Sequence, residues 1–363
     1  MRWTDDLFLE TAKASGNHRR ATLQLGMYAQ HLGSANGLLC KTLKVDTIKR
    51  YIQNVSDFFT NFGTPRVDFR YDTQGDKTFS PVLTSVYKEL ARWESVPNRR
   101  EAFTLAMLDA LRERITKTKP HFHSLICALA DQFEIGLFNG QCWAEFAQTP
   151  ATSDPDHPQL NIAGDAQAFC LNDTRVVTAD GRSLVGAAML QVPVEQCSTG
   201  FVRWRFQKNG DNGQELMWAV ASLDDDYSLV VPLYNVVRRF VALRGAADIT
   251  TPLALYATTR KHKPVVRLIT DRDIEGLMRS LACEVYKFHP VKDKAILSKW
   301  SAHSLRVGAA VLLHAMDFTG EQIKFILRWR SNAFMVYLRS NIILANKQVR
   351  ALNEASKLMP NPC

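Results

Sequence analysis

The residues best suited to chemistry lie between positions 301 and 340. His303 and Arg306 stand three residues apart in Ser-Ala-His-Ser-Leu-Arg, so one face of a helix presents both side chains. An imidazole beside a guanidinium near a helix start forms a cradle for a phosphate. The guanidinium supplies two parallel N–H donors, and the imidazole exchanges a proton near neutral pH. The pair therefore indicates phosphate chemistry, although a lone His-x-x-Arg on a helix is most often structural.

Two aromatic residues further along the chain could complete such a site. Trp329 offers an indole N–H, and Tyr337, eight residues later, offers a phenol that becomes a nucleophile once its proton is removed. Arg328 and Arg330 flank the tryptophan, and their simplest interpretation is as surface charges. A tryptophan and a tyrosine at this spacing are more often core residues. It is the ordered set of four residues, from His303 to Tyr337, that indicates a site.

Several enzyme classes lack their usual motifs here. No Walker loop, Gly-x-Gly-x-x-Gly, His-Glu-x-x-His or Gly-x-Ser-x-Gly motif occurs in the chain. The seven cysteines are scattered without a Cys-x-x-Cys pair, which argues against a disulfide framework or a zinc ribbon and favours a reducing compartment. We therefore expect neither a cofactor nor a metal ion.

Two basic regions flank a slightly acidic middle of the chain. Residues 1–100 carry a net charge of +5 and residues 292–350 one of +7, within a total of +9 over 363 residues. Separated basic regions suit a polyanion held between them, although an ordinary soluble protein with uneven surface charge remains an alternative. No apolar run reaches the length of a membrane span, and the N-terminus lacks the features of a secretory signal.

Helical patterns fill the first hundred residues. A helix is expected over residues 42–59, capped by Asp46, with an apolar stripe and with Lys44, Lys49 and Arg50 lying off that stripe. A solvated basic face is the alternative explanation for these three charges. Residues 60–80 are rich in Gly, Pro, Asp and Thr and predict a loop. We place a domain boundary between residues 97 and 98.

The middle of the chain carries strand signals. They lie at residues 175–178, 202–206 and 215–220, and the Lys-Asn-Gly-Asp-Asn-Gly connection between the last two predicts a β-hairpin. From Pro232 onward helical patterns dominate again. The sequence thus predicts a mainly α chain with a small antiparallel β-sheet, of the α+β class.

Residues 301–340 resemble the C-terminal signature of the tyrosine recombinases, also called phage-integrase-like recombinases. In that signature a His-x-x-Arg box is followed by a His or Trp and then by the nucleophilic Tyr. The Leu-Arg-Trp-Arg-Ser…Phe…Tyr-Leu-Arg segment is most similar to the version carried by Crypton-like eukaryotic mobile elements. Gly140–Glu145 stands where the family has a Gly-x-Arg-x-x-Glu box, and Lys208 lies in the hairpin where the family has a catalytic lysine. Residues 42–59 resemble the helical core-binding domain.

The resemblance implies catalytic roles for three residues of the signature. Tyr337 would be the nucleophile that attacks the scissile phosphate and forms a 3′-phosphotyrosyl link. Arg306 would clamp the phosphate and stabilise the charge of the transition state. His303 would assist proton transfer and contact the phosphate.

Three further residues receive roles from the same resemblance. Trp329 would take the His/Trp position and support the phosphate through its indole N–H. Lys208 would protonate the leaving 5′ oxygen, and Glu145 would hold the first box in place. Because the phosphotyrosine retains the bond energy and cationic side chains carry the charge, the resemblance implies no ATP and no metal ion.

One position departs from the family pattern. Cys142 stands where the first box should hold an Arg, and its spacing to Glu145 is the expected one. A thiol cannot make two charge-assisted bonds to a phosphate. By analogy with a lost oxyanion donor, the loss costs roughly 3–4 kcal/mol of transition-state stabilisation. The chain is therefore either a working recombinase or an inactive DNA-binding protein of the same fold, and Cys142 itself could be a small core residue.

The resemblance also implies an architecture and partners. A helical DNA core-binding domain with its linker (residues 1–97) and a catalytic domain (residues 98–363) would form a C-shaped clamp on double-stranded DNA. The expected DNA contacts are Lys44, Lys49, Arg50, Arg328 and Arg330. A helix expected at residues 341–358 would pack on a neighbouring protomer and support a tetramer on DNA, or pack within its own protomer.

Two expectations remain for the chain as a whole. The protein should be intracellular, and nuclear if its host is a eukaryote. A helical scaffold that binds protein partners is an alternative from another functional class, and the ordered set of site residues and the basic regions disfavour it.

Overall fold

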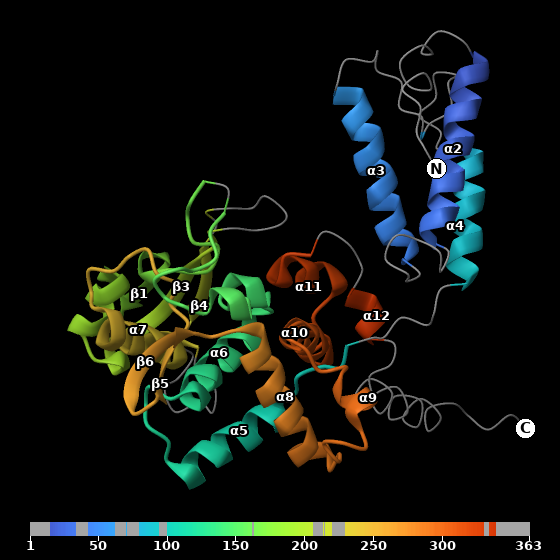
Figure 1. Ribbon diagram of the computed structural model, residues 1–363. Helices are drawn as coiled ribbons and strands as arrows, with labels where there is room; N and C mark the ends of the chain where they lie inside the picture. Colours follow the sequence, from blue (N-terminus) through green and yellow to red (C-terminus); the bar gives the residue numbers. More distant parts are fainter. Residues whose placement is uncertain are drawn as a thin grey trace, which may run out of the picture. The chain divides into compact units, whose positions relative to one another are not determined.

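The computed structural model describes ten stretches of the chain. They are residues 15–33, 43–61, 70, 80–93, 100–161, 163–205, 213, 215–219, 229–329 and 334–338. The chain divides into two compact units, Met1–Asn98 and Arg99–Cys363 (Figure 1). The expected boundary between residues 97 and 98 lies one residue from this division.

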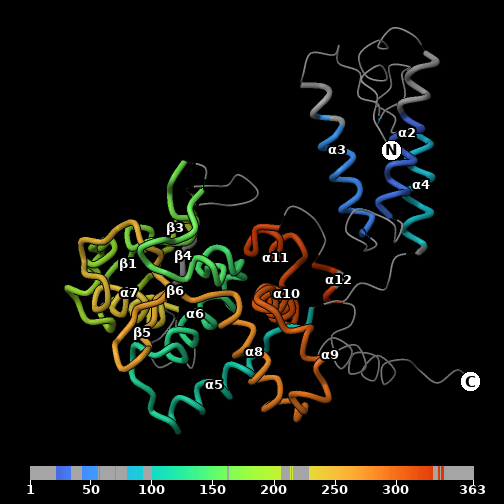
Figure 2. The backbone as a smooth tube through the Cα atoms, viewed as in Figure 1, coloured from blue at the N-terminus to red at the C-terminus, as the bar shows by residue number. Residues whose placement is uncertain are grey.

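Three helices make up the described part of the first unit (Figure 2). They are α2 (Ser15–Gly33), α3 (Val45–Asn61) and α4 (Pro81–Trp93). Leu25, Ile48, Ile52 and Leu83 are almost fully buried between them. The apolar residues recur at helical spacing, so each helix turns one stripe toward the other two. A segment that the sequence predicts as a helix, residues 5–14, lies outside the described residues.

Helix α3 follows the predicted pattern with two corrections. It begins at Val45, so Asp46 lies in the first turn instead of capping the helix. The negative charge of Asp46 there interacts favourably with the positive end of the helix dipole. Tyr51, which stands at helical spacing with the apolar residues of the expected stripe, is nevertheless 42% exposed. Lys44, Lys49 and Arg50 are exposed, as the pattern predicts. Lys49 also forms a solvent-exposed ion pair with Asp46, at 3.5 Å.

The second unit is mainly helical. Its α-helices are α5 (Leu105–Thr118), α6 (Leu125–Asn139), α7 (Val230–Arg244), α8 (Asp271–Tyr286), α9 (Lys294–Leu297), α10 (Ser304–Ala315), α11 (Gly320–Leu327) and α12 (Met335–Leu338). Short 3₁₀ helices span Trp143–Glu145, Pro150–Thr152, Leu171–Asp173, Gly186–Gln191 and Val194–Gln196. Helix α10 is central, because it packs against α6, α11 and α12 (Figure 1).

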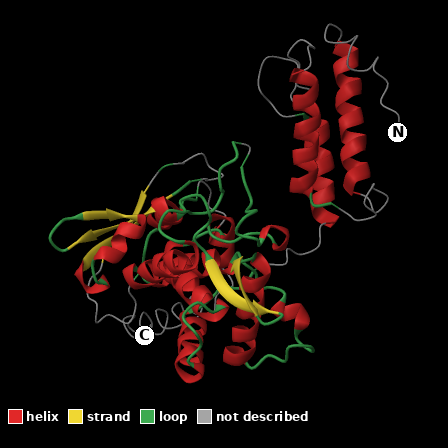
Figure 3. Cartoon of the chain, turned by 60° about the vertical axis from the view of Figure 1, so that its left-hand side comes forward, coloured by secondary structure: helices red, strands yellow, loops and turns green. Residues whose placement is uncertain are grey.

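Two small antiparallel sheets accompany these helices (Figure 3). The first has the strand order β2-β1-β3-β4, from β1 (Thr174–Thr178), β2 (Ser183–Val185), β3 (Cys197–Arg203) and β4 (Glu215–Ala219). The predicted antiparallel pairing of the last two strands is confirmed, with Gly200 opposite Trp218. The connection that carries Lys208 lies outside the described residues.

Sequence reasoning missed the second sheet. Strands β5 (Leu255–Arg260) and β6 (Lys263–Leu268) form a hairpin within the region that we expected to be helical. Its two-residue turn, Lys261-His262, has positive φ angles of 48° and 64° without the glycine that usually marks such a turn. The absence of that marker explains the omission. The fold class is nevertheless confirmed, because the described chain is mainly helical with small antiparallel sheets.

The described helices do not include a membrane span. None of them is long and apolar enough to cross a bilayer.

Candidate functional site

The first turn of α10 positions His303 and Arg306. Ser304 begins the helix, and its buried hydroxyl accepts a hydrogen bond from the Ser301 N–H at 3.1 Å, which fixes the chain as it enters the turn. Arg306 lies three residues after His303 in the first turn and is only 8% exposed, whereas His303 is half-buried. The two side chains therefore share one end of the helix, as their spacing predicts.

Close packing holds α10 against its neighbours. A Cβ at Gly308 would lie 2.1 Å from the Phe103 carbonyl oxygen, and one at Gly136 of α6 would lie 2.9 Å from Leu305 Cδ1. The Gly308 distance is to a backbone atom that cannot move aside, so only glycine allows this approach, whereas at Gly136 the Leu305 side chain would have to shift. The position of Arg306 therefore depends above all on the contact between Gly308 and the Phe103 carbonyl.

Arg306 links three segments of the second unit. Its Nη1 donates a hydrogen bond to Cys142 Sγ at 2.9 Å, and its Nη2 donates one to the Leu327 carbonyl oxygen at 2.7 Å. The guanidinium carbon lies 5.3 Å from the centroid of the Trp329 ring. The loop after α6, the end of α11 and the start of α10 thus meet at one guanidinium group.

The loop after α6 brings Cys142 and Glu145 into this site. Gly140 ends α6 with φ +57°, and a Cβ there would lie 2.4 Å from Leu327 Cδ2. The glycine therefore permits both the turn and the contact with α11. Glu145 Oε2 then accepts the Cys142 N–H at 2.7 Å, which closes the loop on itself.

The ionisation of the loop residues leaves the site positively charged. Burial raises the pKa of the Cys142 thiol, more than the Arg306 guanidinium lowers it, so the thiol is neutral and does not cancel the charge of Arg306. Burial also raises the pKa of Glu145, against the opposing effects of Arg328, Arg306 and the Cys142 N–H. We treat Glu145 as ionised, because a protonated acid would leave two buried guanidinium groups without a counter-charge.

Helix α12 places Tyr337 beside His303. The Tyr337 hydroxyl lies 3.3 Å from His303 Nε2, and the two ring centroids are 5.9 Å apart. Tyr337 is half-buried, and the Trp329 ring lies 6.4 Å from it. The phenol is therefore held at the imidazole, at the edge of the site that contains Arg306.

His303 is unprotonated at neutral pH, as a proton acceptor must be. Burial lowers its pKa to about 4, and the positive charges of Arg306 and Arg100 add to that effect. The imidazole is thus neutral at pH 7. In the tautomer protonated at Nδ1, Nε2 accepts the hydrogen bond from the phenol and is ready to receive its proton.

Arg328 differs from its expected place at the surface. Its side chain is only 9% exposed, and its Nη2 lies 3.4 Å from Glu145 Oε2. The guanidinium stacks on Trp204 with its carbon 3.5 Å from the ring centroid. No local sequence pattern predicts this burial, because Trp204 and Glu145 are far from Arg328 along the chain.

The structure thus gathers seven of the predicted site residues. Cys142, Glu145, His303, Arg306, Arg328, Trp329 and Tyr337 lie within one chain of contacts. Lys208 and Arg330 lie outside the described residues, as does the helix expected at 341–358. Lys44, Lys49 and Arg50 belong to the other compact unit.

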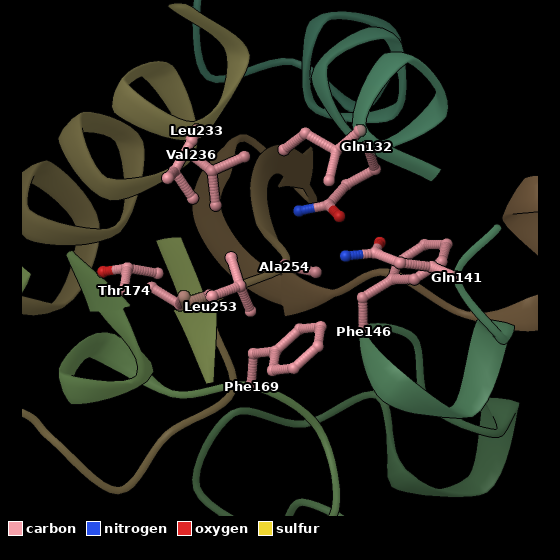
Figure 4. Close-up of a pocket in the computed structure, with 11 residues that line it drawn as sticks. Gln132, Gln141, Phe146, Phe169, Thr174, Leu233, Val236, Leu253 and Ala254 are labelled. Carbon is pink, nitrogen blue, oxygen red and sulfur yellow. The ribbon is translucent and has the colours of Figure 1, made fainter. Parts of the chain in front are cut away.

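A small cavity lies behind the loop that carries Cys142 (Figure 4). Gln141 and Gln132 turn their amides toward each other inside it, among Phe146, Phe169 and Leu253. Its volume of about 20 Å³ accommodates about one water molecule and no organic ligand. Gln141 lines this cavity, whereas its neighbour Cys142 accepts a hydrogen bond from Arg306.

Comparisons with known proteins give structural neighbours only. No family model matches the chain. No curated protein matches it either. The Tn1549 transposon integrase in complex with a circular intermediate DNA is 12% identical, with 94% of this chain and 86% of that chain covered and a TM-score of 0.37. The site-specific recombinase XerH bound to its difH substrate is 11% identical, with 96% and 85% covered and a TM-score of 0.37. The XerA recombinase is 11% identical, with 97% and 95% covered and a TM-score of 0.32.

These TM-scores lie below 0.5, so the functional assignment rests on the geometry of the site. One further observation concerns metal ions. Within the part of the chain that the structure describes, no three His, Cys, Asp or Glu side chains are grouped as metal ligands.

Proposed function

We propose that this protein is a tyrosine-type recombinase that cleaves and rejoins DNA strands through a covalent link to Tyr337. The observation that carries the proposal is the hydrogen bond between the Tyr337 hydroxyl and His303 Nε2, 3.3 Å long, at the edge of the residue cluster that contains Arg306. A phenol paired with a neutral imidazole beside a buried guanidinium has the parts for attack on a phosphodiester. The segment around Trp329 favours a recombinase of the Crypton-like mobile-element type.

The proposed cleavage step exchanges one phosphate ester for another. The Tyr337 oxygen attacks the scissile phosphorus while its proton passes to His303 Nε2. A bond forms between that oxygen and phosphorus, and the bond from phosphorus to the 5′ oxygen of the next nucleotide breaks. The 5′ oxygen takes up a proton, for which we propose Lys208 as the donor. Reversal of the step with a new 5′ hydroxyl rejoins the strand.

The charged groups supply electrostatic stabilisation in this proposal. Arg306 would donate to two non-bridging oxygens of the phosphate, after exchanging its contact with the neutral Cys142 thiol. Trp329 would donate its indole N–H to the same phosphate. Glu145 would position the loop and Arg328, and would not touch the substrate. The exchange of one ester for another needs neither ATP nor an oxidant.

We extend the proposal to the DNA duplex. Lys49 and Arg50 are exposed on α3, and Lys44 is exposed just before it; all three would contact the phosphate backbone. A tetramer on DNA and an intracellular location, nuclear in a eukaryotic host, belong to the same proposal.

A nicked duplex provides the test of strand cleavage. A nick close to the cleavage site releases the short 5′-hydroxyl fragment, so the covalent protein–DNA link accumulates. Because the target sequence is unknown, the duplexes carry a randomised central segment, and covalent products are recovered after denaturation. The wild-type chain should give a covalent product, and Tyr337→Phe should give none. A product that persists in Tyr337→Phe contradicts the assignment of the nucleophile.

Cys142 favours a second candidate function, an inactive DNA-binding protein of the same fold. Its thiol occupies the position where the family pattern has a guanidinium, and it contacts Arg306. This candidate predicts DNA binding with steep salt dependence and no covalent product. Binding that is absent, or that does not change with salt, favours the protein-interaction scaffold instead.

A further inference from the structure

We propose that Arg328 is a second phosphate-binding residue of this site and takes the role of the guanidinium that position 142 lacks. The inference rests on the proposed function and deepens it, because it assigns a catalytic role to a residue that the recombinase signature does not include. Four observations carry it: the place of the side chain, its orientation, its backbone conformation and the charge of the pocket.

Arg328 lies at the same carboxylate as the loop that carries Cys142. Glu145 Oε2 accepts the Cys142 N–H at 2.7 Å and lies 3.4 Å from Arg328 Nη2. The Arg328 carbonyl oxygen is also 3.5 Å from Arg306 Nη2. The end of α11 therefore brings a second guanidinium to the cluster of residues that contains Arg306.

Trp204 fixes the plane of this guanidinium. The guanidinium carbon lies 3.5 Å from the centroid of the indole ring, and Trp204 itself is 1% exposed. Stacking involves the face of the guanidinium, and its in-plane Nη2 donates to the Glu145 carboxylate, so a phosphate would bind in exchange for such contacts. A planar group held in this way is pre-organised for the two parallel hydrogen bonds that a phosphate accepts.

The backbone at Arg328 adopts a conformation that usually favours glycine. Its φ is +55° at the end of α11, which costs a side-chain-bearing residue about 1 kcal/mol. Lys119 and Lys287 end α5 and α8 in the same conformation, but their side chains are exposed. Only Arg328 among these three buries its charge, and burial lowers its pKa against the opposing effect of Glu145. A strained and desolvated cation is characteristic of a functional site.

Arg328 raises the positive charge of the residues around Glu145. Arg306 and Arg328 each carry one positive charge, Glu145 carries one negative charge, and His303 and the Cys142 thiol are neutral at pH 7. Among these five residues the net charge is +1, and without Arg328 it would be zero. Arg328 therefore supplies net positive charge that favours a phosphodiester, and Arg100, which acts on His303 from nearby, adds to it.

The test moves the guanidinium from position 328 to position 142 and measures covalent-product formation in the nicked-duplex assay. Arg328→Gln should slow covalent-product formation about 100-fold, the effect of removing one transition-state donor. Arg328→Lys retains the positive charge but lacks the two parallel N–H donors of the guanidinium. Its rate of covalent-product formation should lie between those of Arg328→Gln and wild type. Adding Cys142→Arg to Arg328→Gln should recover at least about tenfold of the lost rate, because it returns a guanidinium to the pocket. Cys142→Arg alone should change the rate by less than Arg328→Gln does.

A matched control separates loss of chemistry from loss of folding. Arg239 is also a buried arginine in an ion pair, 2.6 Å from Asp131, and its contacts lie elsewhere in the same unit. Arg239→Gln should lower the melting temperature as Arg328→Gln does, but it should form the covalent product at the wild-type rate when both proteins are assayed below their melting transitions. If Arg328→Gln also reacts at the wild-type rate, the inference is overturned while the proposed function stands.

A binding experiment decides the inference even if the wild-type chain does not cleave DNA. In the Tyr337→Phe background, the slope of log binding constant against log salt concentration measures phosphate contacts. Arg328→Gln should lower the magnitude of that slope by about 0.9, whereas Arg239→Gln should leave it unchanged. An unchanged slope for Arg328→Gln overturns the inference. Absence of a covalent product in the wild type, together with the lowered slope, overturns cleavage but supports the phosphate contact.

Discussion

His303 is the residue whose environment most affects the chemistry of the site. Its pKa falls to about 4 because it is buried and faces two arginines, Arg306 and Arg100. A histidine that is neutral throughout the physiological range can accept a proton from Tyr337 without a change of pH. At the scale of one residue, burial therefore keeps a group that normally titrates near pH 6.5 unprotonated at physiological pH, and at the same time makes it a weaker base.

The same shift predicts how stability depends on pH. Above about pH 6.5 His303 is neutral in both the folded and the unfolded chain, so it contributes no pH dependence. Between about pH 6.5 and about 4 only the unfolded chain takes up the proton, so the free energy of unfolding falls by up to about 1.4 kcal/mol per pH unit. Below about pH 4 both states are protonated and the loss stops.

Urea unfolding of wild type and His303→Gln at pH 7.5, 6.0 and 5.0 measures this contribution. The glutamine variant lacks the titrating group, so the difference between the two free energies of unfolding should shift in its favour as the pH falls. Carboxylates titrate in both proteins and cancel in the difference. Parallel pH curves for the two proteins contradict the assigned environment of His303.

At the scale of elements, close helix packing sets the geometry of the site. Helix α10 brings Arg306 into the site only because Gly308 allows the helix to pack against the Phe103 carbonyl. A Cβ at position 308 would lie 2.1 Å from that carbonyl oxygen. Gly140 plays the corresponding part where the loop after α6 meets α11. The site is therefore sensitive to residues that carry no functional group.

Gly308→Ala tests this dependence. The added methyl should displace α10, lower the free energy of unfolding by about 1–3 kcal/mol or more and reduce covalent-product formation. Gly276→Ala in α8 is the matched control, because nothing lies within 4 Å of its Cβ. That variant should be unchanged or more stable by up to about 1 kcal/mol. Equal melting temperatures for the two variants contradict the packing argument.

The sequence predicted elements better than it predicted contacts between them. The bounds of α8 follow directly from a capping box at Thr270–Asp273 and an amphipathic pattern, both of which are local signals. The β5–β6 hairpin was missed because its turn, Lys261-His262, lacks a glycine. The ordered signature placed His303, Arg306 and Tyr337 together, but the burial of Arg328 on Trp204 depends on residues more than a hundred positions apart and left no local pattern.

At the scale of the whole molecule, the charge distribution predicts a DNA-binding helix in the first unit. Replacing Lys44, Lys49 and Arg50 with glutamine should lower the magnitude of the salt slope of duplex binding by up to about 2.7, which is 0.9 for each phosphate contact. Lys88 and Arg92 are exposed on α4 of the same unit and provide the control. The same replacement there should lower the slope by less for each charge removed, since that variant removes two charges and not three. An equal effect per removed charge assigns the binding to net charge and not to α3.

The central claim is that the phenol of Tyr337 becomes esterified to a DNA 3′ phosphate. The direct measurement is mass spectrometry of the peptide that contains residue 337, after the wild-type chain has reacted with nicked duplexes and the DNA has been digested to a nucleotide stub. We predict a phosphonucleotide on Tyr337 in the wild-type chain and an unmodified peptide in His303→Ala, in which proton transfer is impaired. A nucleotide attached to any other residue, or a covalent product in Tyr337→Phe, would contradict the account.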